Sequence, residues 1–127
     1  MADKTVLIVD DEDNFAHALD IVLSRHGYRT RRAADGTSAL AALQDGSIDV
    51  VLLDILLPDR SGFEICQAIR QTVGLRDLRV IMMTARGSQA ERRKGLALGA
   101  DAFLIKPFPT SELVREIDIL TGKGRDA

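Results

Sequence analysis

The sequence lacks the cysteine pairs typical of small secreted proteins and the long apolar stretches typical of membrane proteins. Its 127 residues include one cysteine, so an internal disulfide is excluded, and the apolar helical surroundings of Cys66 favour a packed thiol. No apolar stretch approaches the roughly 20 residues that a membrane-spanning helix needs, and the first residues form no apolar signal segment. These absences predict a cytoplasmic protein that does not bind membranes.

An excess of charge of one sign is also lacking. Lysine and arginine number 17 against 19 aspartate and glutamate residues, and the net charge of −2 argues against direct nucleic-acid binding by this chain. The sequence contains no tryptophan and is 46% hydrophobic and 28% charged, which is typical of a globular protein. The length fits one domain. We expect that domain over residues 1–121, followed by a flexible tail at residues 122–127.

Four short apolar runs are the clearest positive feature, and each is followed by residues that can take part in chemistry. The runs and the residues after them are 6–9 with Asp10 and Asp11, 50–53 with Asp54, 80–83 with Thr84, and 102–105 with Lys106. Apolar runs without alternation are typical of strands buried on both faces of a parallel sheet. Ligands of such sheets bind beyond the carboxyl ends of the strands, so the sequence predicts one site there.

Segments of helical periodicity separate the apolar runs. Five helices are expected. The first has Asp13 or Asn14 as N-cap and stops at Gly27, the second runs near residues 37–43, and the third follows a loop over residues 58–62. The fourth covers residues 88–98, and the last begins near Thr110 or Ser111, with Ser111 as cap. The apolar stripe of the first helix is expected at Phe15, Ala18, Leu19, Val22 and Leu23. A weak, arginine-rich strand at residues 28–33 suits a sheet edge. The pattern predicts an α/β fold of five strands and five helices, with helices on both faces.

The doubly wound topology brings the polar strand ends together. Strands 1 and 3 are expected to be neighbours, about 4.8 Å apart, so the carboxylates of Asp11 and Asp54 lie close. At about 5 Å and an effective dielectric near 20, such a pair repels by roughly 3 kcal/mol. Oxygen ligands without histidine suit Mg²⁺, and Lys106 can reach Asp54 across the sheet end. With the hydroxyl of Thr84, this group supports phosphoryl transfer to an aspartate.

Motifs spread over most of the chain carry a family resemblance. They are Val9-Asp10-Asp11-Glu12, Gly27-Tyr28, Ala34-Asp35-Gly36, Asp54 followed by Pro58 and Gly62, Thr84-Ala85, Gly99-Ala100-Asp101, and Lys106-Pro107-Phe108. With these motifs in this order, the chain resembles a response-regulator receiver domain, the phosphoacceptor module of two-component signalling. The resemblance implies a flavodoxin-like (βα)5 fold with a five-stranded parallel sheet in the order 2-1-3-4-5.

The resemblance also implies the reaction. Asp54 would accept a phosphoryl group from a phosphohistidine of a sensor histidine kinase or a histidine phosphotransfer protein. The reaction would need Mg²⁺, held by Asp54, by Asp11 directly, by Asp10 through water and by the backbone carbonyl of Leu56. Lys106 would pair with the phosphoryl group. The protein would be a switch rather than an enzyme, with self-catalysed phosphotransfer and autodephosphorylation only.

The resemblance implies how phosphorylation would reach the surface. Thr84 would move to bind the phosphoryl oxygen and Phe103 would turn inward, which changes the face formed by the fourth helix, the fifth strand and the fifth helix. The Lys106–Pro107 peptide bond is expected to be cis. The altered face would control binding of a downstream protein by a monomer or weak dimer. Phe103 stands where the family often has tyrosine, so packing alone must transmit the change.

Other interpretations of the same residues remain open. A magnesium-dependent phosphohydrolase with an aspartate nucleophile shares this chemistry, but it needs an acid two residues after the nucleophile, where this chain has Leu56. The flavin-carrier alternative lacks a phosphate loop after the first strand, and a constitutive binding module would not need the full acid, hydroxyl and lysine set. Glu12 is interpreted as a helix-start acid. The arginines of residues 29–32 are interpreted as solvated charges of an edge strand rather than a phosphate-binding stripe.

Two positions are expected to tune the lifetime of the phosphoryl group. Leu56 is apolar where the family commonly has methionine, and Arg86, two residues after Thr84, could reach over the phosphoryl group. We predict that Arg86→Ala changes the rate of self-dephosphorylation, measured as the half-life of the phosphorylated purified protein. An unchanged half-life would reject that role for Arg86.

Overall fold

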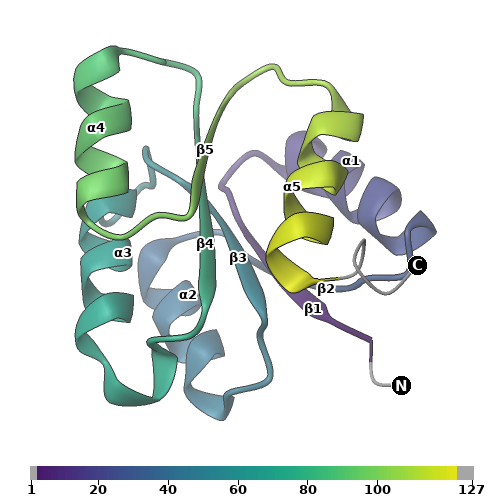
Figure 1. Ribbon diagram of the computed structural model, residues 1–127, viewed down its shortest axis with the longest axis horizontal. Helices are drawn as coiled ribbons and strands as arrows, with labels where there is room; N and C mark the ends of the chain where they lie inside the picture. The colour runs from purple at the N-terminus through teal and green to yellow at the C-terminus, as the bar shows by residue number, and fades with distance from the viewer. Residues whose placement is uncertain (1–2, 123–127) are drawn as a thin grey trace.

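Five parallel strands form the middle layer of the protein, seen in the computed structural model, which describes residues 3–122 (Figure 1). The strands are β1 (Thr5–Val9), β2 (Arg29–Ala33), β3 (Val50–Asp54), β4 (Arg79–Thr84) and β5 (Ala102–Ile105). They lie in the order β2-β1-β3-β4-β5, and every neighbouring pair is parallel. The predicted fold and strand order are confirmed.

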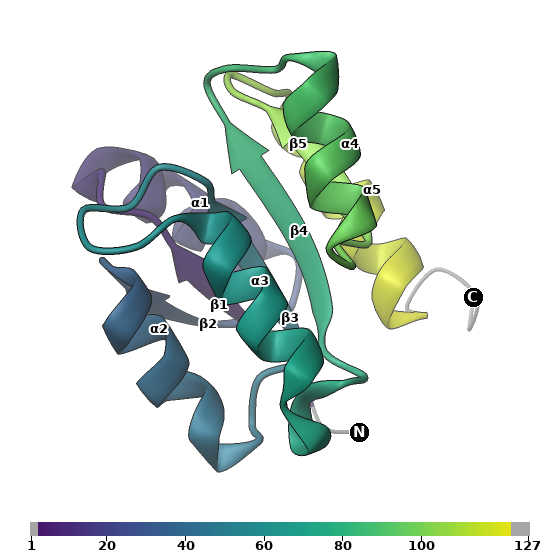
Figure 2. The ribbon, with the colours of Figure 1, turned by 90° about the vertical axis from the view of Figure 1, so that its left-hand side faces the viewer.

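Helices cover both faces of this sheet. They are α1 (Asp13–Arg25), α2 (Gly36–Ala42), α3 (Gly62–Gln71), α4 (Gln89–Ala97) and α5 (Thr110–Thr121), with short 3₁₀ turns η1 (Leu43–Asp45) and η2 (Val73–Leu75). Figure 2 shows α2, α3 and α4 on one side of the sheet, and α1 and α5 lie on the other (Figure 1). Within residues 3–122, no helix is long and apolar enough to cross a membrane.

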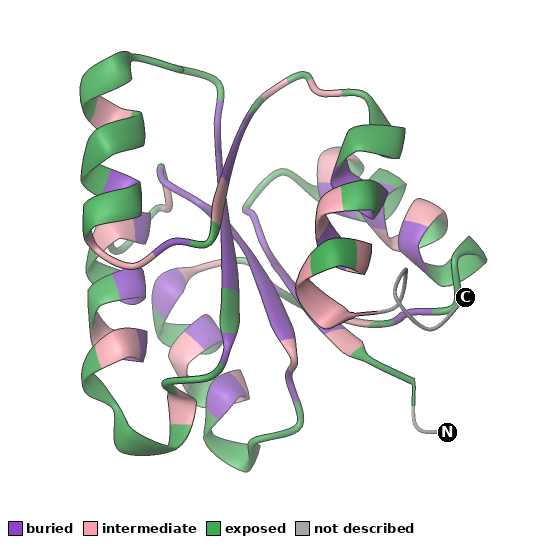
Figure 3. Ribbon diagram, viewed as in Figure 1, coloured by how far each residue is buried: buried purple, intermediate pink, exposed green. Residues whose placement is uncertain are grey.

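The inner positions of the central strands are apolar because each face of the sheet has its own core. Leu7 and Leu53 face the core under α2 and α3, whereas Ile8 and Leu52 face the core under α1 and α5. All residues of β3 are buried, and Figure 3 shows the central strands mainly in the colour of buried residues. The edge strand β2 is largely exposed instead. Double-sided burial therefore explains the apolar runs and leaves polar side chains at the strand ends or just beyond them.

The first helix differs from its predicted start and stripe. Glu12, rather than Asp13 or Asn14, is the N-cap of α1, and the Glu12 amide is already engaged by the carboxylate of Asp10 at 2.9 Å. This turn shifts the helix start by one residue. Ala16 is buried, whereas Ala18, expected in the stripe, is exposed. The other four predicted stripe residues, Phe15, Leu19, Val22 and Leu23, pack in the core, so the phase of the helix is confirmed and only Ala18 is misplaced.

The last helix also starts differently. Pro109 is the N-cap of α5, with φ −63° and no side-chain cap, so Thr110 begins the helix and Ser111 lies in its first turn. The fixed φ of proline sets the direction of entry, and a serine cap is not needed. Gly122, the first residue of the predicted tail, is the left-handed C-cap of α5 with φ 77°. The rest of that tail, residues 123–127, lies outside the described residues.

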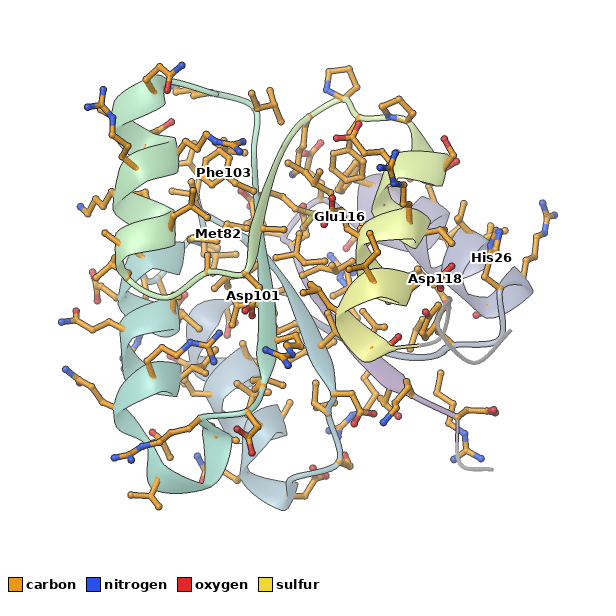
Figure 4. The ribbon with its side chains drawn as sticks, viewed as in Figure 1. His26, Met82, Asp101, Phe103, Glu116 and Asp118 are labelled. Atoms are coloured by element: carbon orange, nitrogen blue, oxygen red, sulfur yellow. The ribbon has the colours of Figure 1, made fainter. Side chains whose placement is uncertain are left out.

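Arg70 links segments at the end of the sheet where the strands begin. Its guanidinium donates to the carbonyl of Gly99 at 2.7 and 3.0 Å and to the carbonyl of Leu78 at 2.6 Å. It also pairs with Asp101 at 3.0 Å, and Asp101 accepts from the amide of Val80 at 2.8 Å (Figure 4). One side chain of α3 thereby fastens the start of β4 and the turn between α4 and β5.

Tyr28 fastens the start of β2 to the last turn of α5. Its side chain is buried, and its hydroxyl donates to Asp118 and lies 3.4 Å from the hydroxyl of Thr121 (Figure 4). Burial, and then the hydrogen bond to Asp118, raise the pKa of Tyr28 to about 12. The folded state therefore stabilises the neutral, protonated form of the Tyr28 side chain.

We predict that Tyr28→Phe lowers the free energy of unfolding by about 1 kcal/mol at neutral pH, because it removes one partly buried hydrogen bond. In the wild type, the contribution of the neutral phenol is complete below its ordinary pKa of 10.0 and is lost as pH rises through about 12. Since the chain has one tyrosine and no tryptophan, phenolate absorbance follows Tyr28 alone. Phenolate formation near pH 10 in protein still folded by circular dichroism would contradict this.

Candidate functional site

Three carboxylates meet where β1 and β3 end. Asp54 is the last residue of β3, and Asp10 and Asp11 follow β1 directly. One oxygen of each lies within 4.8 Å of the others. Asp10 is fully buried and Asp54 is 6% exposed, whereas Asp11 is exposed. The pairing of β1 with β3 brings these side chains together because parallel neighbours end at the same edge of a sheet.

Lys106 is the cation of this cluster. Its Nζ lies 2.6 Å from Asp10 Oδ2 and 3.1 Å from Asp54 Oδ2, and 3.7 Å from an oxygen of Glu12. The ammonium also lies 4.3 Å from the centre of the Phe15 ring, a cation–π contact. The Lys106 side chain is 10% exposed, and its peptide bond to Pro107 is cis. The lysine thus spans from β5 to the ends of β3 and β1.

One ammonium does not balance the carboxylates. Burial raises the pKa of Asp54, and the negative charge of Asp10 adds to that, although Lys106 opposes both. Burial by itself would lower the pKa of Lys106, but its hydrogen bonds to Asp10 and Asp54 reverse this, and the net direction is upward. The upward shifts of both pKa values are consistent with each other, because Lys106 gains two carboxylate partners while Asp54 shares a single ammonium with Asp10. Together with Asp11, the cluster keeps an excess of negative charge.

The donor atoms fit a hard divalent cation. The cluster offers carboxylate oxygens only, with no histidine or cysteine in the group found among residues 3–122. Mg²⁺ prefers such oxygens and usually takes one or two protein carboxylates and several waters. The residues that could hold such a cation are therefore Asp10, Asp11 and Asp54, whose carboxylates together carry more negative charge than Lys106 balances.

The loop after β3 is held tightly against Asp54. The amide of Leu56 donates to Asp54 Oδ1 at 3.1 Å, while the Leu56 side chain is 57% exposed. At Gly62, a Cβ atom would lie 2.3 Å from the carbonyl oxygen of Asp54, so only glycine allows the loop to return this closely. The backbone of Leu56 is thereby kept beside the carboxylate.

The remaining predicted residues lie around the cluster rather than in it. The Thr84 hydroxyl accepts from the amide of Arg86 at 3.1 Å, and no hydrogen bond joins Thr84 to Asp54 in the described part of the chain. The Arg86 residue is exposed. Phe103 is buried beside Met82 (Figure 4), where Gly95 of α4 leaves room: a Cβ there would lie 3.3 Å from the Phe103 ring.

Arg32 is a residue of the site that the sequence interpretation did not find. Its guanidinium donates to the backbone carbonyl of Asp10 at 2.9 and 3.3 Å and to the carboxylate of Asp13 at 2.6 Å. The other edge arginines are ion-paired too, Arg29 with Asp3 at 3.8 Å and Arg31 with Asp45 at 3.1 Å. The sequence did offer a signal for this contact: Arg32 lies near the end of β2, and the neighbouring strand β1 ends in an acidic turn.

Comparison with known proteins agrees with this geometry. The family model of the response regulator receiver domain matches residues 6–118. The chain belongs to the response regulator receiver domain family. The sensory transduction protein RegX3 of Mycolicibacterium smegmatis is 38% identical over 122 residues, which cover 96% of this chain and 52% of RegX3. This receiver domain therefore spans about half the length of that curated relative.

Solved structures of receiver domains and response regulators have the same fold. A putative response regulator from Chloroflexus aurantiacus is 37% identical with a TM-score of 0.89, over 94% of this chain and 98% of that one. The chemotaxis protein CheY4 of Vibrio cholerae is 32% identical with a TM-score of 0.88, over 94% and 99%. The predicted family is confirmed: this chain is a response-regulator receiver domain of a two-component system, and the domains of this family act as switches.

We predict that Asp11→Asn stabilises the protein when divalent cations are absent, because it removes one unbalanced charge from the cluster. Exposure of Asp11 limits the gain to about 0.5 kcal/mol. Excess Mg²⁺ is expected to raise the stability of the wild type and to have much less effect on the variant. Urea unfolding with chelator and with Mg²⁺ measures both, with Asp77→Asn as a control acid remote from the cluster. Equal Mg²⁺ effects on all three proteins would contradict the expectation.

Proposed function

We propose that this receiver domain accepts a phosphoryl group on Asp54 from a phosphohistidine of a sensor histidine kinase or a histidine phosphotransfer protein. The observation that carries the proposal is the position of Asp54 at a buried strand end, 3.1 Å from Lys106 and within 4.8 Å of oxygens of Asp10 and Asp11. A nucleophile, a cation and a group of metal-binding oxygens are the parts that phosphoryl transfer uses.

The transfer is a displacement at phosphorus. A carboxylate oxygen of Asp54 forms a bond to phosphorus, and the bond between phosphorus and the imidazole nitrogen breaks, with its electron pair leaving on the imidazole. Lys106 keeps its ammonium beside the reacting carboxylate and offsets charge on the phosphoryl oxygens. Its hydrogen bond to Asp10 holds the ammonium in place during the reaction.

Mg²⁺ is the proposed cofactor. Asp10, Asp11 and Asp54 would hold it, with the backbone carbonyl of Leu56 as a further ligand. The ion supplies charge neutralisation between the acceptor carboxylate and the incoming phosphoryl group. With the ion bound, Asp54 would face a second cation beside Lys106, which would oppose the burial and repulsion that raise its pKa.

The proposed response of the protein runs from Thr84 to Phe103. The Thr84 hydroxyl oxygen accepts from the amide of Arg86, and its own hydrogen would donate to a phosphoryl oxygen. Phe103, opposite Met82 in the pairing of β4 with β5, is already buried without a phosphoryl group, so the proposed change is a repacking of this side chain rather than the inward turn expected from the sequence. It also lines a surface groove between α4 and α5, together with Arg92 and Glu116. Binding of a downstream protein at this face is the proposed output.

A magnesium-dependent phosphohydrolase is the weaker alternative. Such an enzyme needs an acid two residues after its nucleophile, and the exposed aliphatic side chain of Leu56 occupies that position. The proposal of a switch needs no such acid, because the aspartyl phosphate is its product.

We predict that the protein incubated with Mg²⁺ and a small phosphodonor gains one phosphoryl group, detected by intact mass. Asp54→Asn is expected to abolish the adduct, and omission of Mg²⁺ to reduce it by at least tenfold, in line with the general effect of losing charge stabilisation. Asp77→Asn, a matched change of an exposed aspartate, should leave the adduct unchanged. An adduct that persists in Asp54→Asn, or its absence from the wild type, overturns the assignment.

A further inference from the structure

Every polar atom of Asp10 has a partner within the protein. The amide donates to the carbonyl of Ala33 at 3.1 Å, Oδ1 accepts from the amide of Glu12 at 2.9 Å, and Oδ2 accepts from Lys106 at 2.6 Å. The backbone carbonyl accepts from Nη2 and Nε of Arg32 at 2.9 and 3.3 Å. Four residues, two of them on β2, therefore fix this single residue.

We propose that Arg32 is a positioning residue for the acidic metal site. It holds the turn between β1 and α1 at two places, the carbonyl of Asp10 and the carboxylate of Asp13, and so sets where Asp10 and Asp11 present their oxygens. This inference rests on the proposed function, because it concerns the Mg²⁺ site of the same cluster. It adds a residue of the edge strand β2 to that site.

Register explains why an arginine at this position reaches the turn. In the pairing of β1 with β2, Ile8 lies opposite Arg32 and Val9 opposite Ala33. The chain of β1 continues for one residue beyond that ladder, to Asp10, whose carbonyl lies past the last strand pair. Arg32 extends along the edge and supplies the donors there.

Burial makes the contact matter. Asp10 is 0% exposed, so its carbonyl has no access to water, and removal of Arg32 leaves a buried acceptor without a donor. The turn must then shift to hydrate that carbonyl. Asp11 follows in the chain, and its carboxylate has no hydrogen bond or ion pair within residues 3–122. The backbone alone places it, so a shift of Asp10 displaces Asp11.

Two effects of Arg32 on a bound cation have opposite signs. Its positive charge repels a cation, so loss of charge alone would tighten binding. Its hydrogen bonds hold the ligands in place, so loss of those bonds weakens binding. The carboxylate of Asp13 at 2.6 Å neutralises much of the Arg32 charge, and the positioning effect is therefore the larger. Whether loss of Arg32 weakens or tightens Mg²⁺ binding therefore distinguishes the positioning effect from the charge effect.

The test is a Mg²⁺ titration of unphosphorylated protein, followed by amide nuclear magnetic resonance, with circular dichroism to verify folding. We expect Arg32→Ala to weaken Mg²⁺ binding roughly tenfold, in the range typical of lost outer-shell partners. Arg32→Lys keeps the charge but not the planar fork, so it should also weaken binding. Arg31→Ala is the matched control, since Arg31 lies on the same strand and pairs with Asp45 at 3.1 Å, away from the cluster.

A second measurement excludes a merely structural role. The rate of phosphoryl uptake by Arg32→Lys should fall at limiting Mg²⁺ and return close to the wild-type rate at saturating Mg²⁺, because only the metal site is displaced. A deficit that saturating Mg²⁺ does not restore contradicts the inference. Unchanged or tighter Mg²⁺ binding by Arg32→Ala, or wild-type binding by Arg32→Lys, also overturns it; if Arg32→Ala does not fold, Arg32→Lys decides alone.

The outcomes keep this inference separate from the proposed function. Failure of the wild type to take up a phosphoryl group on Asp54 refutes the proposed function, whatever Arg32 does. Normal uptake by the wild type, with equal Mg²⁺ affinity in the wild type, the two Arg32 variants and the Arg31 control, refutes only the role of Arg32.

Discussion

The contact of one ammonium with two buried carboxylates is the interaction on which the rest of the site depends. Lys106 joins Asp10 to Asp54, and in doing so it ties the ends of β1, β3 and β5 together at the edge where the strands finish. Without that contact the carboxylates would meet with nothing between them. With it, their repulsion is reduced but not removed, because a third carboxylate, that of Asp11, remains unmatched.

This partial balance suits a switch better than a complete one would. A fully neutralised cluster would have little reason to take up a cation, and a cluster without Lys106 would lose stability to repulsion. The protein maintains the intermediate condition by fixing the backbone rather than by adding charge. Gly62 allows the loop after Asp54 to approach closely, and Arg32 holds the turn that carries Asp10.

Strand identity and the meeting point of the polar groups could be predicted from the sequence for one physical reason. Strands buried on both faces must be apolar throughout, so the first polar residue after each run marks the sheet edge, as at Asp54 and Lys106. The large apolar residues of the first helix were placed correctly, but which of its alanines faces the core was not, as Ala16 and Ala18 show. The contact of Arg32 was missed because a long side chain on an exposed strand has many directions available, and the register between strands selects one.

The Arg70 clasp has a mechanical consequence for α4. The carbonyl of Gly99 and the carboxylate of Asp101, just beyond the carboxyl end of this helix, are fastened to α3 through one guanidinium. At the opposite end, the helix starts after an exposed loop and is capped by the hydroxyl of Ser88. The end of α4 remote from the acidic cluster is thus its fastened end, and a displacement of the proposed kind, starting near Thr84, would be larger at the Ser88 end than at this clasp.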